Sequence, residues 1–170
     1  MGDVFKEQIV KKVETPLDFA KKVGLIVAVI VIGIITLMTP AAAFVPIILA
    51  AAGFGAFYLM SFIKVEYEYV FTNGELDIDV IYNRSRRKRV FSSHVNKFDI
   101  MAHIEDMTHA GSFNNAQEAL NFSSGVVGPS TYVFLLSYKS KQTKVIIEPN
   151  EKMMKAISGS MSRSKLHIKK

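Results

Sequence analysis

Residues 23–63 read VGLIVAVIVIGIITLMTPAAAFVPIILAAAGFGAFYLMSFI, which is 41 consecutive residues without an Asp, Glu, Lys or Arg. Each crossing of a bilayer by a helix requires about 20 apolar residues, and a soluble protein of this size has little use for an uncharged run twice that long. The run therefore predicts a membrane protein rather than a purely soluble domain.

Two prolines divide this run. Pro40 and Pro46 are expected to end one helix and begin another, because proline is tolerated in the first turn of a helix but not in its interior. We expect helices over residues 16–38 and 42–63, joined by a short uncharged turn into a transmembrane hairpin. The alternatives are buried helices of a soluble bundle and a cleaved signal peptide that ends at residues 41–43.

Basic residues flank the hairpin on one side of the membrane only. Five lysines precede the first helix or lie in its first turns, and Lys64 and a basic cluster follow the second helix, whereas the connecting turn has none. The positive-inside rule then places both termini in the cytoplasm of a protein that crosses the cell membrane twice.

The N-terminal segment, residues 1–15, contains apolar residues at a four-residue spacing, Phe5, Ile9 and Val13. This spacing is typical of a helix that lies in the membrane interface. The alternative is an ordinary frayed terminus of mixed charge.

Residues 64–160 show the alternation of a small β domain. Val65–Phe71 and Leu76–Ile81 alternate apolar and charged side chains, and Asn73-Gly74 between them is a strong hairpin signal. The pairing places Glu68 opposite Asp79, so a positive partner is expected nearby. Further strands are expected at residues 97–103, 131–138 and 143–148.

The basic cluster that follows the hairpin supplies that positive charge and is the candidate binding site: Arg84, Arg86, Arg87, Lys88 and Arg89. Arg87 and Arg89 are expected beside Asp79. Three interpretations remain open for the cluster, namely a solvated charged face, a site for anionic lipid headgroups, and a nucleic-acid site. No nucleic-acid motif accompanies it, so nucleic acid is the least favoured of the three and is not among the predicted partners.

The remaining part of the domain is less regular. Residues 104–130 read as a long loop with a short helix around residues 114–121. A last helix follows Pro149, with Met153, Ile157 and Met161 on the face that packs on the sheet, and residues 161–170 are expected to form a loose basic tail. The predicted fold class is α+β: a transmembrane hairpin, then a small antiparallel sandwich or barrel closed by a C-terminal helix.

The hairpin sequence Glu68–Leu76, the basic third strand and the terminal helix resemble the bacterial PH-like domains found on membrane proteins. The segments Asn121–Gly125 and Ile147–Met153 are similar to those of an uncharacterised family of small two-helix membrane proteins from Gram-positive Firmicutes. The resemblance implies a PH-like fold and no known activity.

Residues for catalysis or metal binding form no recognised pattern. The chain has no cysteine, which excludes thiolate metal sites and thiol nucleophiles. His103, Glu105, Asp106 and His109 match no metal motif, and Ser92-Ser93-His94 lacks a third group and an oxyanion hole. Gly125-Val126-Val127-Gly128 lacks the Lys-Ser/Thr pair of a phosphate loop. We therefore expect no enzyme, metal or cofactor.

The expected function is that of a membrane-anchored binding module, which contacts anionic lipid headgroups or protein partners at the cytoplasmic face. The first alternative is an accessory subunit of a larger membrane complex, because Gly53 and Gly55 permit close helix packing. A more distant alternative is an enzyme with a site in residues 104–130.

Overall fold

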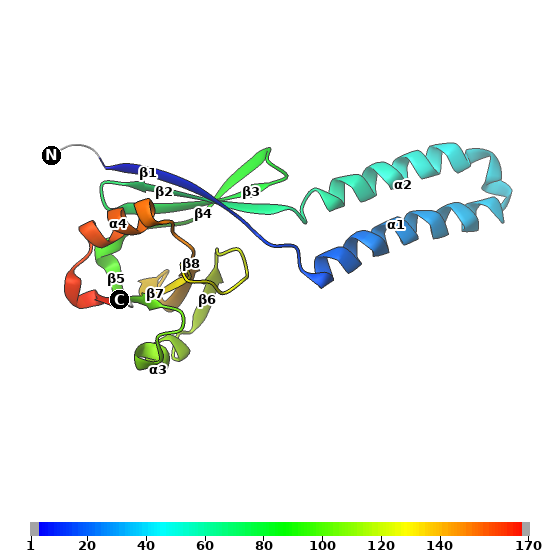
Figure 1. Cartoon of the computed structure of the whole chain (residues 1–170). Helices are drawn as coiled ribbons and strands as arrows, with labels where there is room; N and C mark the ends of the chain where they lie inside the picture. The colour runs from blue at the N-terminus through cyan, green and yellow to red at the C-terminus, as the bar shows by residue number, and fades with distance from the viewer. Residues whose placement is uncertain (1–3, 168–170) are drawn as a thin grey trace. The chain divides into compact units, whose positions relative to one another are not determined.

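The computed structural model describes residues 4–167, which form two compact units (Figure 1). The smaller unit contains residues 14–65 and 82–85. The larger unit contains the described residues 4–13, 66–81 and 86–167. The chain therefore begins in the larger unit, forms the smaller one and returns.

The smaller unit is a helical hairpin of α1 (Pro16–Leu37), the short 3-10 helix η1 (Pro40–Phe44) and α2 (Val45–Met60). Helix α1 begins at the predicted residue, Pro16, because a capping box precedes it. The Thr15 hydroxyl accepts a 3.2 Å hydrogen bond from the Asp18 amide, and the Asp18 carboxylate accepts a 3.1 Å hydrogen bond from the Thr15 amide. Helix α2 ends at Met60, three residues earlier than expected.

Both arms of this hairpin, Pro16–Leu37 and Pro40–Met60, are long and apolar enough to cross a membrane. The buried residues of α1 are Asp18, Gly33 and Thr36, and α2 has none. Gly33 is the point of close approach, since a Cβ there would lie 3.0 Å from a methyl carbon of Leu49. This exposure differs from that of core helices in a soluble bundle, which bury one face.

One sheet of the larger unit consists of β1 (Phe5–Lys11), β2 (Val65–Thr72), β3 (Glu75–Tyr82) and β4 (Arg86–His94), paired in that order. The expected hairpin turn is present: Asn73 and Gly74 both have positive φ, and a Cβ on Gly74 would lie 2.7 Å from His94. Glycine is therefore required there both for its backbone and for the close approach of the histidine ring.

The prediction of an interfacial helix in residues 1–15 is wrong. Residues 5–11 are strand β1, which pairs antiparallel with β2 from Phe5 opposite Thr72 to Lys11 opposite Glu66. The pairing satisfies the backbone groups that face β2 and directs Val10 into the core, while Phe5 and Ile9 remain exposed. Residues 1–3 lie outside the described residues.

The second sheet has the order β6-β8-β7-β5-β9. Its long strands are β5 (Phe98–His103), β7 (Tyr132–Tyr138) and β8 (Lys141–Ile147), close to the predicted ranges. Two short strands pair in parallel: β6 (Glu118–Asn121) with β8, and β9 (Leu166–His167) with β5. The sheet is therefore mixed rather than purely antiparallel.

These short strands correct two predictions. The expected helix around residues 114–121 is instead the end of the short helix α3 (Ala110–Asn114) followed by strand β6. The expected loose tail is ordered as far as residue 167, because Met161 is buried in the core and Leu166 pairs opposite Met101. Residues 168–170 lie outside the described residues.

The main core lies between the two sheets and is closed by α4 (Glu151–Ser160), as predicted from its apolar stripe (Figure 1). Tyr69 joins the layers: its hydroxyl donates to the Phe122 carbonyl at 2.6 Å and accepts from the Glu148 amide at 3.2 Å. Burial raises the pKa of Tyr69, so the phenol stays protonated and able to donate.

A smaller core covers the other face of the second sheet. Phe113 of α3 packs there against Ala102, Val133 and Leu135. Much of the irregular stretch after Ile104 therefore has a packing role.

Candidate functional site

The turn between β3 and β4 belongs to the helical unit. Residues 82–85 form this turn, which we call the hairpin-base turn. The Asn83 amide donates to the Lys64 carbonyl at 3.1 Å, and the ring of Tyr82 lies 5.7 Å from that of Phe62 in an edge-on contact. Asn83 and Arg84 both have positive φ, which lets the chain reverse within a few residues. The turn is thereby fixed at the polar end of the helices.

A pocket of about 320 Å³ opens beside this turn, and we call it the hairpin-base pocket. Phe57 and Met60 supply an apolar wall, and Ser61 and Asn83 supply polar atoms. Two lysines, Lys22 from α1 and Lys64 from the segment after α2, complete the lining. A pocket that combines two cations with an apolar wall has the chemistry to hold a phosphate group and the start of an acyl chain.

The charge of this pocket is only partly neutralised. Lys22 Nζ lies 2.6 Å from a carboxylate oxygen of Glu14, whose side chain is about half exposed. Exposed ion pairs of this kind contribute little to stability, so exchange of Glu14 for a phosphate costs little. Lys64 is exposed at the pocket rim.

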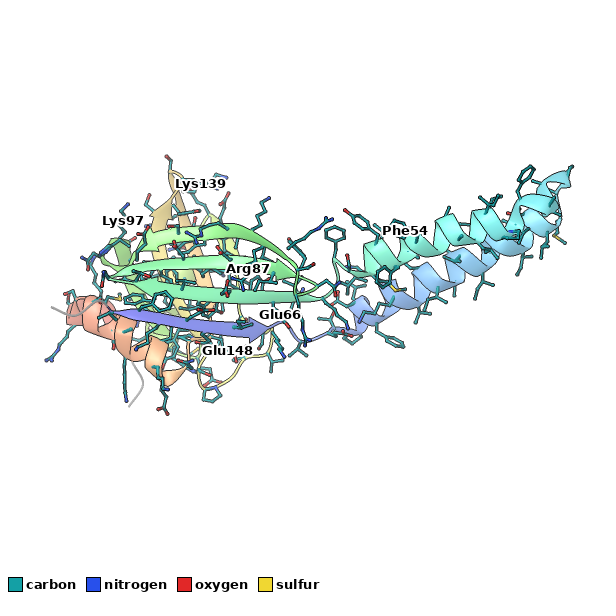
Figure 2. All side chains as sticks on the ribbon, turned by 90° about the horizontal axis from the view of Figure 1, so that it is seen from above. Phe54, Glu66, Arg87, Lys97, Lys139 and Glu148 are labelled. Atoms are coloured by element: carbon teal, nitrogen blue, oxygen red, sulfur yellow. The ribbon has the colours of Figure 1, made fainter. Side chains whose placement is uncertain are left out.

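Two members of the basic cluster neutralise carboxylates on the outer face of the first sheet, as the sequence predicts for this strand. Arg89 bridges two carboxylates, with Nε 2.7 Å from Asp79 and Nη1 2.6 Å from Asp77. Arg87, labelled in Figure 2, lies 2.9 Å from Glu68, which is 2% exposed. Asp79 raises the pKa of Arg89, mainly through its hydrogen bond to the guanidinium, and the negative charge of Asp77 adds to this effect.

Glu68 is the most buried acid of this network. Burial raises its pKa, and the neighbouring carboxyl of Glu7 raises it further by a hydrogen bond that requires one of the two groups to be protonated. The positive charge of Arg87 acts in the opposite direction. Arg87 therefore serves to offset the cost of a buried carboxylate.

The members of the basic cluster lie in two places. Arg84 is in the hairpin-base turn, and residues 86–89 are in β4, where Arg87 and Arg89 form ion pairs within the sheet. Lys88 is exposed on β4. The sequence analysis expected Arg87 and Arg89 beside Asp79 but did not group Lys22 with Lys64. The position of these two lysines at the two ends of the uncharged run 23–63 was the available signal.

The histidines make local contacts. Asp106 accepts at 3.0 Å from His109, and this hydrogen bond, together with those from Thr108, lowers the pKa of Asp106 to about 2. His109 also lies 4.1 Å from the ring of His167, while Ser92 donates to Glu75 rather than to His94. Over residues 4–167, no group of three or more His, Asp or Glu is arranged to hold a metal ion.

The family comparison covers nearly the whole chain. The model of the family described as "Bacterial PH-like domain (DUF6106)" matches residues 2–166. The chain belongs to this family. No curated protein and no solved structure matched it.

The match includes both units of this PH-like protein, so the helical hairpin lies within the family's own boundaries. PH-like domains are in general binding modules without enzymatic activity. The two-sheet core closed by α4 agrees with that assignment.

Proposed function

We propose that the protein is a membrane-anchored binding module without enzymatic activity. The hairpin of α1 and α2 crosses the cell membrane twice, both termini lie in the cytoplasm, and the PH-like unit is held at the inner surface. There the hairpin-base pocket binds the headgroup of an anionic phospholipid.

The observation that carries this proposal is the make-up of the hairpin-base pocket. Its apolar wall, Phe57 and Met60, belongs to the last turn of an apolar helix, and Lys64 follows four residues after that helix ends. Phospholipids present the same sequence of groups, an acyl chain and then a phosphate, at the edge of the hydrocarbon core.

The short connections between the units support a position at the membrane surface. Four residues separate α2 from β2, and four separate β1 from α1. Lys11 at the end of β1 pairs with Glu66 at the start of β2, so both connections leave the same end of one sheet. A basic residue near an anionic leaflet contributes about 1 kcal/mol to attraction, or about fivefold in affinity.

The test uses the full chain in mild detergent and measures retained lipid by native mass spectrometry, with phosphatidylserine and phosphatidylcholine offered together. The unmodified protein should retain phosphatidylserine in preference. The double variant Lys22→Ser, Lys64→Ser should lose about 30-fold of that preference, which corresponds to about 2 kcal/mol for two bases.

The matched control removes the same charge from the exposed face of α4, with Lys152→Ser and Lys155→Ser. This control should keep the preference. Equal loss of the preference in both double variants would mean that net charge, and not the pocket, determines lipid retention. An unchanged preference in the pocket variant would contradict the proposal.

A second candidate function, an accessory subunit of a larger membrane complex, is favoured by the glycines of α2. A Cβ added at Gly53 or Gly55 would meet no atom within 4 Å, so these residues do not serve the packing of α2 against α1. They leave a smooth surface to which a helix of another protein can pack closely. A partner that co-purifies with the unmodified chain and is lost on Gly53→Leu would support this candidate.

A further inference from the structure

The loop between β6 and β7 displays two adjacent valines. Val126 and Val127 are 56% and 57% exposed, although valine side chains are among those most often buried. Residues 122–131 contain no charged side chain. The tip of this loop is therefore apolar, and its removal from water would expose no charge to an apolar medium.

Hydrogen bonds hold the backbone of the loop on both sides of the exposed valines. The Ser124 amide donates to the Glu148 carboxylate at 3.0 Å, and the Gly125 amide donates to the Ser123 hydroxyl at 3.2 Å. On the far side of the tip, the Gly128 amide donates to the Thr131 hydroxyl at 2.9 Å. The valines are thus presented by a fixed backbone, which lowers the entropy lost when a surface binds them.

The loop is also tied to the chain just before helix α1. The carbonyl of Ser124 accepts a 2.8 Å hydrogen bond from the amide of Val13. Val13 is three residues before Pro16, the first residue of α1, and three extended residues span at most about 11 Å. This covalent limit on the distance from Val13 to Pro16 holds for any orientation of the two units.

The start of α1 has the character of a membrane interface. Leu17 and Phe19 are exposed in its first turn, and Lys21 and Lys22 follow before the uncharged run begins. Long basic side chains at such a position extend toward the headgroups while their stems remain in apolar surroundings. The headgroup region on each side of a bilayer is roughly 7 Å deep, comparable to the reach of the linker.

We propose that the Val126–Val127 tip inserts into the headgroup region of the same membrane that the helices cross. The tip then forms a third attachment point of the PH-like unit, beside its two covalent connections. This inference rests on the proposed membrane crossing of α1 and α2. The lipid bilayer is favoured over a protein as the occupant because the chain itself brings the loop within reach of the interface.

The test uses the absence of native cysteine to attach one environment-sensitive fluorophore at a time to the full chain in lipid vesicles. The probe sites are Val126→Cys, Ser140→Cys in the turn after β7, and Ile30→Cys in the middle of α1. Val126 lies in the loop before β7 and Ser140 in the turn after it, and the strand between them spans roughly 20 Å at 3.4 Å per residue. All three positions are exposed, so the substitutions leave the core unchanged.

The expected result is a shift of emission to shorter wavelength and strong quenching by shallow spin-labelled lipid at position 126, with neither at position 140. Position 30 is tested with deep spin-labelled lipid, because it lies in the middle of α1. Quenching at position 30 by the deep label but no quenching at position 126 by the shallow label would overturn the inference and leave the membrane crossing intact. Absence of quenching at position 30 by the deep label would overturn the membrane crossing, and with it this inference.

Discussion

The guanidinium of Arg87 lies 2.9 Å from the carboxylate of Glu68, an acid that is 2% exposed on the outer face of a four-stranded sheet. This pair shows that part of the basic cluster has a structural role. Arg84 of the same cluster lies outside this sheet, in the hairpin-base turn.

Arg89→Ser should destabilise the protein. Arg89 is the shared partner of Asp77 and Asp79, and its loss leaves two largely buried carboxylates side by side. Because Arg89 itself is about half exposed, we expect a loss of about 1–2 kcal/mol in unfolding free energy rather than the larger cost of a fully buried pair. Denaturant unfolding of the purified protein measures this loss.

Lys88→Ser is the control, since it removes one positive charge from an exposed position of the same strand. It should change the unfolding free energy by less than about 0.5 kcal/mol. Equal destabilisation by the two substitutions would mean that net charge, and not the bridge, stabilises the sheet.

Glu68→Gln should make the protein more stable at neutral pH by about 1 kcal/mol, because the amide keeps a partner for Arg87 and can donate to Glu7. The raised pKa of Glu68 means that the folded state holds this proton more tightly than the unfolded state. The contribution of Glu68 to the stability of the unmodified protein therefore falls as pH rises above 4.5, until Glu68 is ionised in the folded state. Thermal melts between pH 4 and 8 should show a melting temperature that depends less on pH in the variant than in the unmodified protein. The same pH dependence in both proteins would refute this account.

Tyr69→Phe should cost about 1–3 kcal/mol of unfolding free energy. The substitution preserves the ring but removes the hydroxyl that bonds both the Phe122 carbonyl and the Glu148 amide, which then remain buried without this partner. Tyr67→Phe on the same strand is a comparison with a less buried ring. An unchanged unfolding free energy for Tyr69→Phe would show that water replaces the hydroxyl as the hydrogen-bond partner.

Gln8→Ala tests the assignment of residues 5–11 to a strand. The Gln8 amide group donates to the Glu148 carbonyl at 2.8 Å and accepts from the Asn150 amide at 2.7 Å, which fixes β1 beside the start of α4. We expect faster hydrogen exchange across residues 5–11 and a loss of about 1–2 kcal/mol. Unprotected amides over this segment in the unmodified protein would contradict the strand.

Strong local signals allowed much of the fold to be predicted. Pro40 and the uncharged run located the two helices, and Asn73-Gly74 located the β2–β3 turn. The Arg89–Asp79 contact also followed from sequence, because hairpin register places like charges together and the next strand supplies the opposite charge.

The missed elements are those whose structure is set by distant partners. Strand β1 pairs with residues more than 50 positions away, and its four-residue spacing of Phe5 and Ile9 imitates a helix. Strands β6 and β9 are too short for any periodicity and exist because β8 and β5 offer free edges. The hairpin-base pocket was missed for the same reason, since Lys22, Lys64 and Asn83 meet only when the turn packs on the hairpin.

The most direct test of the central claim, that the hairpin crosses the membrane and holds the PH-like unit inside the cell, is cysteine accessibility in intact cells. Single cysteines replace Thr39, in the exposed turn between the helices, and Ser140, in the turn between β7 and β8. A membrane-impermeant maleimide should label residue 39 and not residue 140, and label both after lysis. Labelling at residue 140 but not at residue 39 in intact cells would contradict the claim and place the PH-like unit on the outer surface.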